Sequence, residues 1–210
     1  MSLNLEKPLI YLITKGEATD SNSAESCVRI LETVRAAVEQ EISLIQIREK
    51  RLSGRQLFEL TAAAAEITHG SETRLLVNDR SDIALAAKAD GVHLTTSSLS
   101  AAIIRKTLPK NFVIGVSTHS VDEAILANKD GADFAVFGPV FTTPGKGEPC
   151  GLTELHAVCE KLKPFPIIGL GGIDETNFES VLRSGASGIA AIRYLIEPVN
   201  LRKVAARLLR

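Results

Sequence analysis

Residues 134–147 read FAVFGPVFTTPGKG: an apolar run leads into a loop with two hydroxyls and a lysine between glycines and prolines. Residues 167–173, IIGLGGI, repeat the arrangement, with an apolar run that passes into glycines. Hydroxyls, exposed backbone amides and an ammonium group placed just after a strand can cradle a phosphorylated ligand. Two such turns in one chain predict a substrate with two anionic ends.

Short apolar runs of this kind recur along the chain and alternate with longer segments of helical period. They predict strands at residues 9–14, 44–48, 75–78, 91–94, 112–117, 134–137, 166–170 and 188–192. Because the runs are apolar throughout, they indicate a parallel sheet that is buried on both faces. The segments between them carry apolar helical stripes, two of which are Val28, Leu31, Val34 and Val38, and Leu57, Leu60, Ala64 and Ile67.

An internal echo supports repeated units. Residues 89–92 read ADGV, residues 131–134 read GADF, and residues 185–188 read GASG. Each segment closes a helix and opens a strand, which is typical of successive βα units. Eight units close most economically into an α/β fold of one domain, a single (β/α)8 TIM barrel over residues 1–210, at the short end of its size range.

Composition excludes several classes of function. The chain of 210 residues has 24 Lys and Arg against 25 Asp and Glu, a net charge of -1, so we expect no nucleic-acid partner. No apolar run reaches the roughly 20 residues of a membrane span, and the first residues lack the layout of a signal peptide. Cys27, Cys150 and Cys159 have no metal-binding spacing, which favours a reduced, cytoplasmic location. The sequence leaves the oligomeric state open, with a homo-oligomer as one alternative.

In a barrel of this kind the active site lies where the strands end. The residues expected there are Gln46, Arg48, Lys50, Asn78, Asp79, His93, Ser117, His119, Thr142, Thr143, Lys146, Gly172, Ala191, Ile192 and Arg193. Residues 46, 48 and 50 alternate with period two, so we expect all three to point to one face. Because cations are rarely buried unless they are paired, Arg48 and Lys50 on a buried strand favour function over structure.

Structural interpretations compete with the functional ones at several positions. Asp79 could pair with Arg80 or cap the following helix. His93 could be a hydrogen-bonded core histidine, and His119 could belong to a helix cap. Lys146 could be a solvated loop charge, although its glycine neighbours favour a lid. A nucleophilic Cys150 beside Lys146 is a further alternative to a packing role.

Six segments are recognisable as a set. Residues 46–50 (QIREK), 77–84 (VNDRSDIA), 89–94 (ADGVHL), 115–120 (GVSTHS), 137–141 (FGPVF) and 169–173 (GLGGI) closely resemble, in order, the thiamine phosphate synthase family. The resemblance covers nearly the whole chain. A thiazole tautomerase branch of the same superfamily shares the fold.

The resemblance implies a transferase that joins hydroxymethylpyrimidine diphosphate to a thiazole phosphate and releases diphosphate. Its substrates would be small phosphorylated heterocycles, and catalysis would depend on holding and neutralising the diphosphate. By resemblance, Arg48, Lys50 and Lys146 form the cationic clamp, and Asp79 is a ligand of Mg²⁺. Likewise, Gln46, Asn78 and Ser117 contact the pyrimidine or diphosphate, and Gly172 with residues 191–193 holds the thiazole phosphate.

Three departures from the family pattern stand out. Ser98 occupies the position at which the family has a second aspartate for Mg²⁺. Residues 143–146, TPGK, lack one of the usual hydroxyls, and Arg193 replaces a common serine. The tautomerase branch also lacks that aspartate and uses a histidine at the position of His119 for proton transfer.

Two alternatives of other classes remain open at this point. A phosphate-sugar isomerase or epimerase on the same barrel would explain a phosphate cup but not the row of Gln46, Arg48 and Lys50. A non-catalytic regulatory barrel that binds phosphate would explain the missing aspartate.

Overall fold

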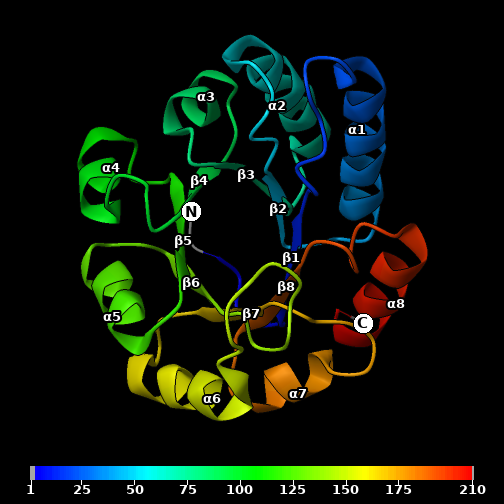
Figure 1. Cartoon of the computed structure of the whole chain (residues 1–210). Helices are drawn as coiled ribbons and strands as arrows, with labels where there is room; N and C mark the ends of the chain where they lie inside the picture. The colour runs from blue at the N-terminus through cyan, green and yellow to red at the C-terminus, as the bar shows by residue number, and fades with distance from the viewer. Residues whose placement is uncertain (1–2, 210) are drawn as a thin grey trace. The chain divides into compact units, whose positions relative to one another are not determined.

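The computed structural model describes residues 3–209. Within them eight strands and eight helices alternate, and the strands are hydrogen-bonded neighbours in the order β1 to β8 of a closed barrel (Figure 1). The pairs β1–β2, β2–β3, β5–β6, β6–β7 and β7–β8 are parallel. The predicted fold class, a (β/α)8 TIM barrel, is confirmed.

Each predicted strand is present, and its ends lie within one residue of the predicted ends. The strands are β1 Leu9–Ile13, β2 Leu44–Ile47, β3 Arg74–Asn78, β4 Gly91–Leu94, β5 Val113–Thr118, β6 Phe134–Phe137, β7 Ile167–Leu170 and β8 Gly188–Ala191. Most strand residues are buried, which is why these segments are apolar throughout instead of alternating.

The helices differ widely in length, and the first two are the longest. They are α1 Ser23–Glu39, α2 Gly54–Thr68, α3 Ser81–Ala86, α4 Ala101–Thr107, α5 Val121–Lys129, α6 Gly151–Leu162, α7 Phe178–Arg183 and α8 Pro198–Leu208. Two of the starts follow local chemistry: Ser53 and Gln56 form a capping box at α2, and Ser120 caps α5 through the Glu123 amide.

The stripe predicted for α1 is only partly right, because Val34 is buried but Leu31 and Val38 are half-buried. The buried face consists of Ser26, Ile30, Val34 and Ala37, whereas Val28 is 57% exposed. Apolar residues in α1 surround more than one face, so their spacing admits two stripes, and tertiary packing selects the one that includes a serine.

The stripe predicted for α2 is nearly right. Leu57, Leu60 and Ala64 are buried, and Ile67 is half-buried. The polar Thr61 shares this buried face because its hydroxyl donates to the Leu57 carbonyl oxygen at 2.7 Å.

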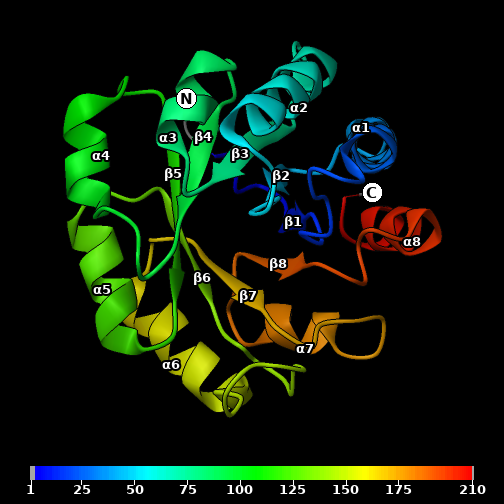
Figure 2. The same cartoon turned by 45° about the horizontal axis from the view of Figure 1, so that its top comes forward.

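The described residues fall into two compact units. Unit 1 comprises residues 3–10 and 93–191, and unit 2 comprises residues 11–92 and 192–209. In unit 1, α4, α5 and α6 lie outside β5 and β6 (Figure 2). In unit 2, α1 packs against both α2 and α8, as Figure 1 also shows.

Two of the repeated segments, residues 89–92 and 131–134, form a similar hydrogen-bonded turn at the start of a strand. In unit 2, the Asp90 carboxylate accepts from the Leu75 amide at 2.8 Å. In unit 1, the Asp133 carboxylate accepts from the Ile114 amide at 2.7 Å and from Arg105 at 2.6 Å. Each aspartate therefore ties the start of one strand to the strand before it.

Among residues 3–209, no helix is both long enough and apolar enough to cross a membrane.

Candidate active site

Two cations follow β2 in unit 2, but not in the way that the alternation predicted. The strand ends at Ile47, so Arg48 and Lys50 lie in the loop beyond it. Arg48 is half-buried and Lys50 is exposed, so the prediction that both lie on a buried strand is wrong. Within the described residues, neither side chain has a hydrogen-bond or ion-pair partner.

The turn after β2 explains why the alternation stops. The Arg48 amide donates to the hydroxyl of Thr14 at 2.8 Å, which ends the strand ladder. Glu49 points inward, is 3% exposed, and accepts hydrogen bonds from the amides of Gly16 and Ala18. The buried position in the turn after β2 therefore belongs to an acid that the sequence analysis did not select.

Gln46 lies within β2 and is 1% exposed. Its side-chain nitrogen donates to the hydroxyl oxygen of Tyr11 at 2.8 Å. Burial raises the pKa of Tyr11 well above its ordinary value, so the phenol stays neutral. This bond fixes the Gln46 amide and leaves its carbonyl oxygen available for other contacts.

Asn78 and Asp79 lie at the same end of unit 2 as Arg48. β3 pairs in parallel with β2, with Ile47 opposite Val77, so the residues after both strands leave the same edge. Asn78 is buried, whereas Asp79 is exposed and has a φ of 62°. This left-handed backbone costs about 1–2 kcal/mol for most residues, and aspartate is one of the few that tolerate it.

The alternative in which Asp79 forms an ion pair with Arg80 is wrong. The guanidinium of Arg80 instead donates to the carboxylate of Asp82, at 2.8 and 2.6 Å. This bond lowers the pKa of Asp82 and raises the pKa of Arg80. Asp79 adds to the raised pKa of Arg80 only through its charge. Asp79 does not cap α3 either, and its carboxylate has no hydrogen-bond partner among the described residues.

One carboxylate without a hydrogen-bond partner is therefore what this loop could offer to a metal ion. Among residues 3–209, no group of three or more His, Cys, Asp or Glu side chains could hold a metal ion by itself. Mg²⁺ is commonly bound through one or two carboxylates, with substrate phosphates and water completing its octahedron. An exposed carboxylate without a hydrogen-bond partner fits that mode of binding.

The turn after β8 continues into unit 2 with Ile192 and Arg193. Ile192 is half-buried and Arg193 is exposed. Within the described residues, neither backbone N–H has a hydrogen-bond acceptor. Ala191, the last residue of β8, is buried and belongs to unit 1.

In unit 1, His93 and Ser117 form a buried pair. His93 is 2% exposed, and its Nε2 atom lies 2.8 Å from the hydroxyl of Ser117. The imidazole also lies against the ring of Phe134, with centroids 6.1 Å apart. His93 is thus a hydrogen-bonded core residue, and it fixes the direction of the Ser117 hydroxyl.

Ser98 belongs to a small turn after β4. Its hydroxyl accepts from the Thr95 amide at 2.7 Å and lies 3.0 Å from the Thr95 hydroxyl. Ser98, at the position where the resemblance leads us to expect an aspartate, is therefore engaged in its own loop.

The two glycine-containing turns of the sequence lie directly against each other in unit 1. The amides of Val140 and Phe141 donate to the carbonyl oxygens of Leu170 and Gly171, at 2.8 and 3.0 Å. A Cβ atom added to Gly172 would lie 2.7 Å from the Phe141 Cβ atom and 2.8 Å from the Thr142 carbonyl oxygen. Glycine is required here by both space and a φ of 63°.

Hydrogen bonds hold the turn after β7 in place. Asn177 donates to the Gly172 carbonyl oxygen at 2.9 Å and accepts from the Asp174 amide at 3.0 Å. The Gly172 N–H has no acceptor within the described residues. The arrangement therefore presents a fixed backbone donor beside residues 142 and 143.

The two threonines after β6 differ in their contacts. Thr143 is half-buried, and its hydroxyl donates to the Phe141 carbonyl oxygen at 2.9 Å. Thr142 is exposed, and its hydroxyl has no partner in residues 3–209. Of the two, Thr142 is thus the one whose hydroxyl can donate to a ligand.

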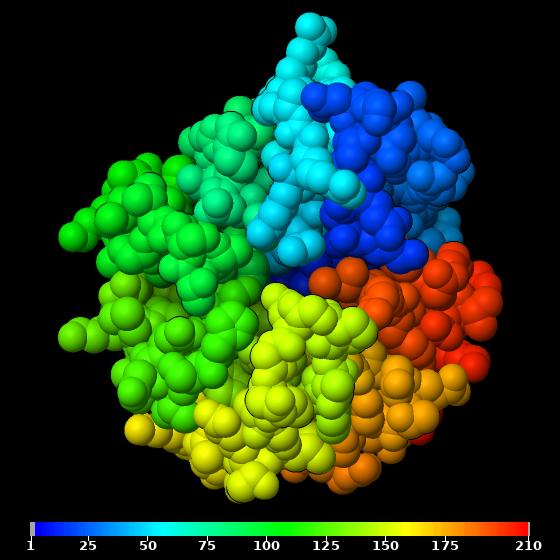
Figure 3. Space-filling view, in the orientation of Figure 1, coloured from blue at the N-terminus to red at the C-terminus, as the bar shows by residue number. Residues whose placement is uncertain are grey.

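Lys146 belongs to the loop between β6 and α6, which faces the viewer in Figure 3. The base of the loop is closed by bonds from the Cys150 and Gly151 amides to the carbonyl oxygens of Pro139 and Val140, at 2.9 and 3.1 Å. Among residues 3–209, no atom other than those of the glycine and its chain neighbours lies within 4 Å of a Cβ atom added to residues 145 or 147. The part of the loop that carries Lys146 is therefore unpacked.

Cys150 does not have the properties of a nucleophile. Burial, followed by the charge of Glu154, raises the pKa of its thiol to about 11. A thiol that is protonated at neutral pH is a poor nucleophile, which favours the packing role of Cys150.

His119 is exposed and takes part in the start of α5. Its amide donates to the Glu123 carboxylate at 2.6 Å, and its Nδ1 atom contacts the Gly138 carbonyl oxygen. Because a carbonyl oxygen only accepts, Nδ1 carries the proton, and the neutral ring has its lone pair on Nε2. The structural and proton-transfer interpretations are therefore compatible.

Comparison with known proteins places this arrangement in a family. Residues 10–195 match the family model described as thiamine monophosphate synthase. The chain belongs to this family. All six motifs quoted from the sequence lie within the matched residues.

Individual relatives match this chain over nearly its full length. A protein of Geobacter sulfurreducens is 43% identical over 203 residues, which is 95% of this chain and 92% of the relative. The thiamine-phosphate synthase of Moorella thermoacetica is 41% identical over 181 residues, which is 85% of this chain and 86% of the relative. The structure of a thiamine phosphate pyrophosphorylase from Pyrococcus furiosus is 31% identical, with a TM-score of 0.81 over 97% of this chain and 98% of that one.

Two residues at the candidate site were missed by the sequence analysis. Glu49 stands between two selected cations, and the signal was an acid in an otherwise basic segment. Asn177 holds the turn at Gly172 from five residues further along the chain, in a loop without any motif.

Proposed function

We propose that this protein is a transferase of the thiamine phosphate synthase type. It would condense hydroxymethylpyrimidine diphosphate with thiazole phosphate to give thiamine phosphate and diphosphate. The 41% identity to a protein named thiamine-phosphate synthase, over 85% of the chain, carries this proposal. The cations and backbone donors at the strand ends supply groups that such a reaction needs.

In the proposed reaction, the bond between the pyrimidine methylene carbon and the diphosphate oxygen breaks, and the electron pair leaves with the diphosphate. The lone pair of the thiazole nitrogen then forms the new carbon–nitrogen bond. Since negative charge grows on the leaving group, cations that meet it lower the barrier. Arg48, Lys50 and Lys146 take this role, and their side chains have no partner within residues 3–209 that would compete for them.

Neutral hydrogen-bonding groups would orient the pyrimidine. Gln46 and Asn78 are buried amides at the ends of neighbouring strands. The Ser117 hydroxyl is held in one direction by His93. Fixed donors and acceptors of this kind favour one orientation of a heterocycle.

The thiazole phosphate would bind to backbone amides and a hydroxyl. Within the described part of unit 1, the N–H of Gly172 and the hydroxyl of Thr142 are unpaired donors. Within that of unit 2, the N–H groups of Ile192 and Arg193 are also unpaired, and the Arg193 side chain adds a cation. Backbone amides and a guanidinium are typical ligands of phosphate.

Mg²⁺ is the proposed cofactor, with Asp79 as its protein ligand. When bound, the ion would neutralise part of the diphosphate charge. Ser98 supplies a hydroxyl that is already engaged with Thr95, so one carboxylate holds the ion in this proposal.

A second candidate function is thiazole tautomerisation. The contact between His119 Nδ1 and the Gly138 carbonyl oxygen favours it, because Nε2 is then free to accept a proton. The loss of the second aspartate at Ser98 points the same way.

Chromatography of the products separates the two functions. With both synthase substrates and Mg²⁺ supplied, thiamine phosphate should accumulate in proportion to enzyme. Isomerisation of the thiazole without any condensation would instead assign the protein to the tautomerases. Binding of neither substrate would remove both proposals.

We also propose a cytoplasmic location. All three cysteines are free thiols, as is usual in a reducing compartment.

A further inference from the structure

Glu49 is a buried carboxylate that the proposed reaction does not use. It is 3% exposed and follows directly after Arg48 in the chain. A buried carboxylate is costly unless hydrogen bonds compensate for its lost hydration. Both oxygens of Glu49 have such bonds: Oε1 accepts from the Gly16 amide at 3.0 Å and Oε2 from the Ala18 amide at 2.9 Å.

These bonds hold the loop between β1 and α1, residues 14–22, against the loop after β2. Further contacts join the same loops. The Arg51 guanidinium donates to the Gly16 carbonyl oxygen and the Ser53 amide donates to Asp20, both at 3.2 Å, and Thr19 forms a β-bridge with Arg51. The Arg48 amide donates to the Thr14 hydroxyl at 2.8 Å, which holds the start of the loop. The Arg51 and Ser53 contacts are exposed, so the bonds made by Glu49 are the stronger constraint on residues 16 and 18.

The held loop lies against Arg48. A Cβ atom added to Gly16, which has a φ of 79°, would lie 3.0 Å from the Arg48 carbonyl oxygen and 3.2 Å from its Nη1 atom. The guanidinium therefore rests on the backbone of Gly16. Any displacement of this loop would change the surface that supports Arg48.

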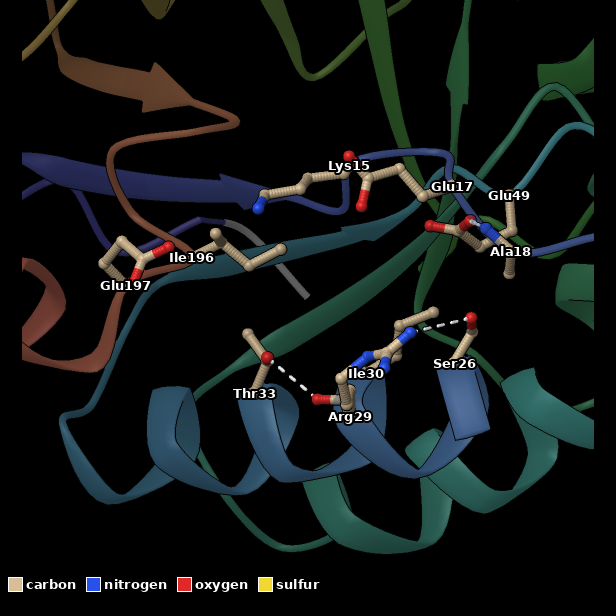
Figure 4. Close-up of a pocket in the computed structure, with 10 residues that line it drawn as sticks. All are labelled: Lys15, Glu17, Ala18, Ser26, Arg29, Ile30, Thr33, Glu49, Ile196 and Glu197. Carbon is tan, nitrogen blue, oxygen red and sulfur yellow. Dashed lines mark hydrogen bonds between the residues drawn. The ribbon is translucent and has the colours of Figure 1, made fainter. Parts of the chain in front are cut away.

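On one side the loop borders a cavity instead of packed side chains. Lys15, Glu17 and Ala18 line one wall of this cavity of about 200 Å³, and Arg29 and Ile30 of α1 line another (Figure 4). Figure 4 also shows the bond between Glu49 and Ala18 at the edge of the cavity. Ala18 is packed, but Glu17 is exposed and the space on this side is hollow, so hydrogen bonds contribute to the position of the loop.

We propose that Glu49 is a positioning residue that holds the β1–α1 loop against Arg48 and so sets the place of its guanidinium. This inference rests on the proposed function, which assigns Arg48 to the diphosphate. It adds a residue that contacts neither substrate nor the reacting atoms.

The two hydrogen bonds of Glu49 predict which substitutions the protein tolerates. Two N–H groups face Glu49, so both side-chain oxygens must accept. In Glu49→Gln the shape is kept, but an NH₂ group meets one of the N–H donors. In Glu49→Asp both acceptors are kept on a shorter side chain. A role in filling space would tolerate glutamine better, whereas the proposed role tolerates aspartate better.

The experiment compares Glu49→Gln, Glu49→Asp and the control Glu17→Gln with the parent protein. Glu17 is an exposed acid of the same loop, and within the described residues its carboxylate has no partner. Calorimetry measures the Kd of inorganic diphosphate, steady-state kinetics measure KM for both substrates, and hydrogen exchange follows the Gly16 and Ala18 amides.

Glu49→Gln should weaken diphosphate binding about tenfold, the effect of one lost charge-assisted bond. KM should rise by a similar factor for the pyrimidine diphosphate and stay within about twofold for the thiazole phosphate. The two amides should exchange faster, Glu49→Asp should lie nearer to the parent, and Glu17→Gln should match the parent.

Three results would overturn the inference: unchanged binding in Glu49→Gln, equal increases of both KM values, or a glutamine variant that outperforms aspartate. If the parent protein is active and Glu49→Gln has the same activity and binding, only the role of Glu49 is refuted. A parent protein that neither turns over nor binds diphosphate removes the proposed function and this role together.

Discussion

The Nε2 atom of His93 lies 2.8 Å from the Oγ atom of Ser117, so a hydrogen bond within unit 1 joins a residue of β4 to a residue of β5. His93 is almost fully buried, while Ser117 is half-buried. The bond thus links a core residue to one that can reach a ligand.

Ser117→Ala should lower the free energy of unfolding by about 1–3 kcal/mol, because the buried imidazole loses this partner. Binding of the pyrimidine substrate should weaken as well. Denaturant unfolding and calorimetry measure the two effects. Ser97→Ala is the control, because among residues 3–209 its hydroxyl has a hydrogen bond only with the Thr95 hydroxyl, at an exposed position. This variant should change stability by less than about 0.5 kcal/mol. Equal stability of both variants would contradict the prediction.

Arg48→Ala and Lys50→Ala should each weaken binding of the pyrimidine diphosphate by about 10- to 150-fold, the range expected for a charge-assisted bond of about 1.5–3 kcal/mol. Stability should change by less than about 0.5 kcal/mol in Lys50→Ala, because the side chain is exposed and unpaired within residues 3–209. Arg55→Ala is the matched control, because Arg55 is an exposed cation that pairs with Glu59 on the same helix. This variant should bind the pyrimidine diphosphate as the parent does. Dissociation constants equal to that of the parent would refute the role of these cations.

Gly172→Ala should reduce both stability and thiazole phosphate binding. The added methyl group would lie 2.7 Å from the Phe141 Cβ atom, in addition to the cost of a φ of 63°. Gly145→Ala separates the two causes, because it has a φ of 75° and no described atom within 4 Å. The control should cost only about 1–2 kcal/mol, from the backbone alone. If the two variants unfold at the same denaturant concentration, the close approach of the loops is not important.

Ser98→Asp should lower the Mg²⁺ concentration needed for half-maximal turnover, because it adds a second carboxylate charge. The turn should survive, since an aspartate oxygen can accept from the Thr95 amide as the serine hydroxyl does. Ser97→Asp, which adds the same charge at an exposed position, should leave the requirement unchanged. The same Mg²⁺ curve for the parent and both variants would mean that residue 98 does not face the metal.

Cys150 should react slowly with iodoacetamide near neutral pH. With a pKa of about 11, only about 0.1% of the thiol is ionised at pH 8. The rate should rise about tenfold per pH unit as the pH approaches 11, and Cys150→Ser should keep full activity. Rapid alkylation at neutral pH would restore the nucleophile as an alternative.

The sequence was sufficient to predict the strands and the two glycine turns. Buried strands of a parallel barrel are apolar throughout, so their runs, such as Phe134–Phe137, are unambiguous. The glycines at 171 and 172 are needed because two loops touch, and a motif can reveal them without any structure.

The sequence was not sufficient for the loop after β2. Residues 46, 48 and 50 would point to one face only if β2 continued past Ile47. The strand ends there because the Arg48 amide donates to the Thr14 hydroxyl. The acid at position 49 is buried by bonds to amides 31 and 33 residues away, and such long-range contacts leave no local pattern.

The aspartates at the starts of strands have a consequence for protein engineering. Asp133 secures the amino end of β6, whereas the loop with Lys146 leaves its carboxyl end. The anchored part and the variable part therefore occupy opposite ends of one strand. A library that randomises residues 142–148 should retain its folded members at a high rate, because none of the randomised side chains takes part in that anchor.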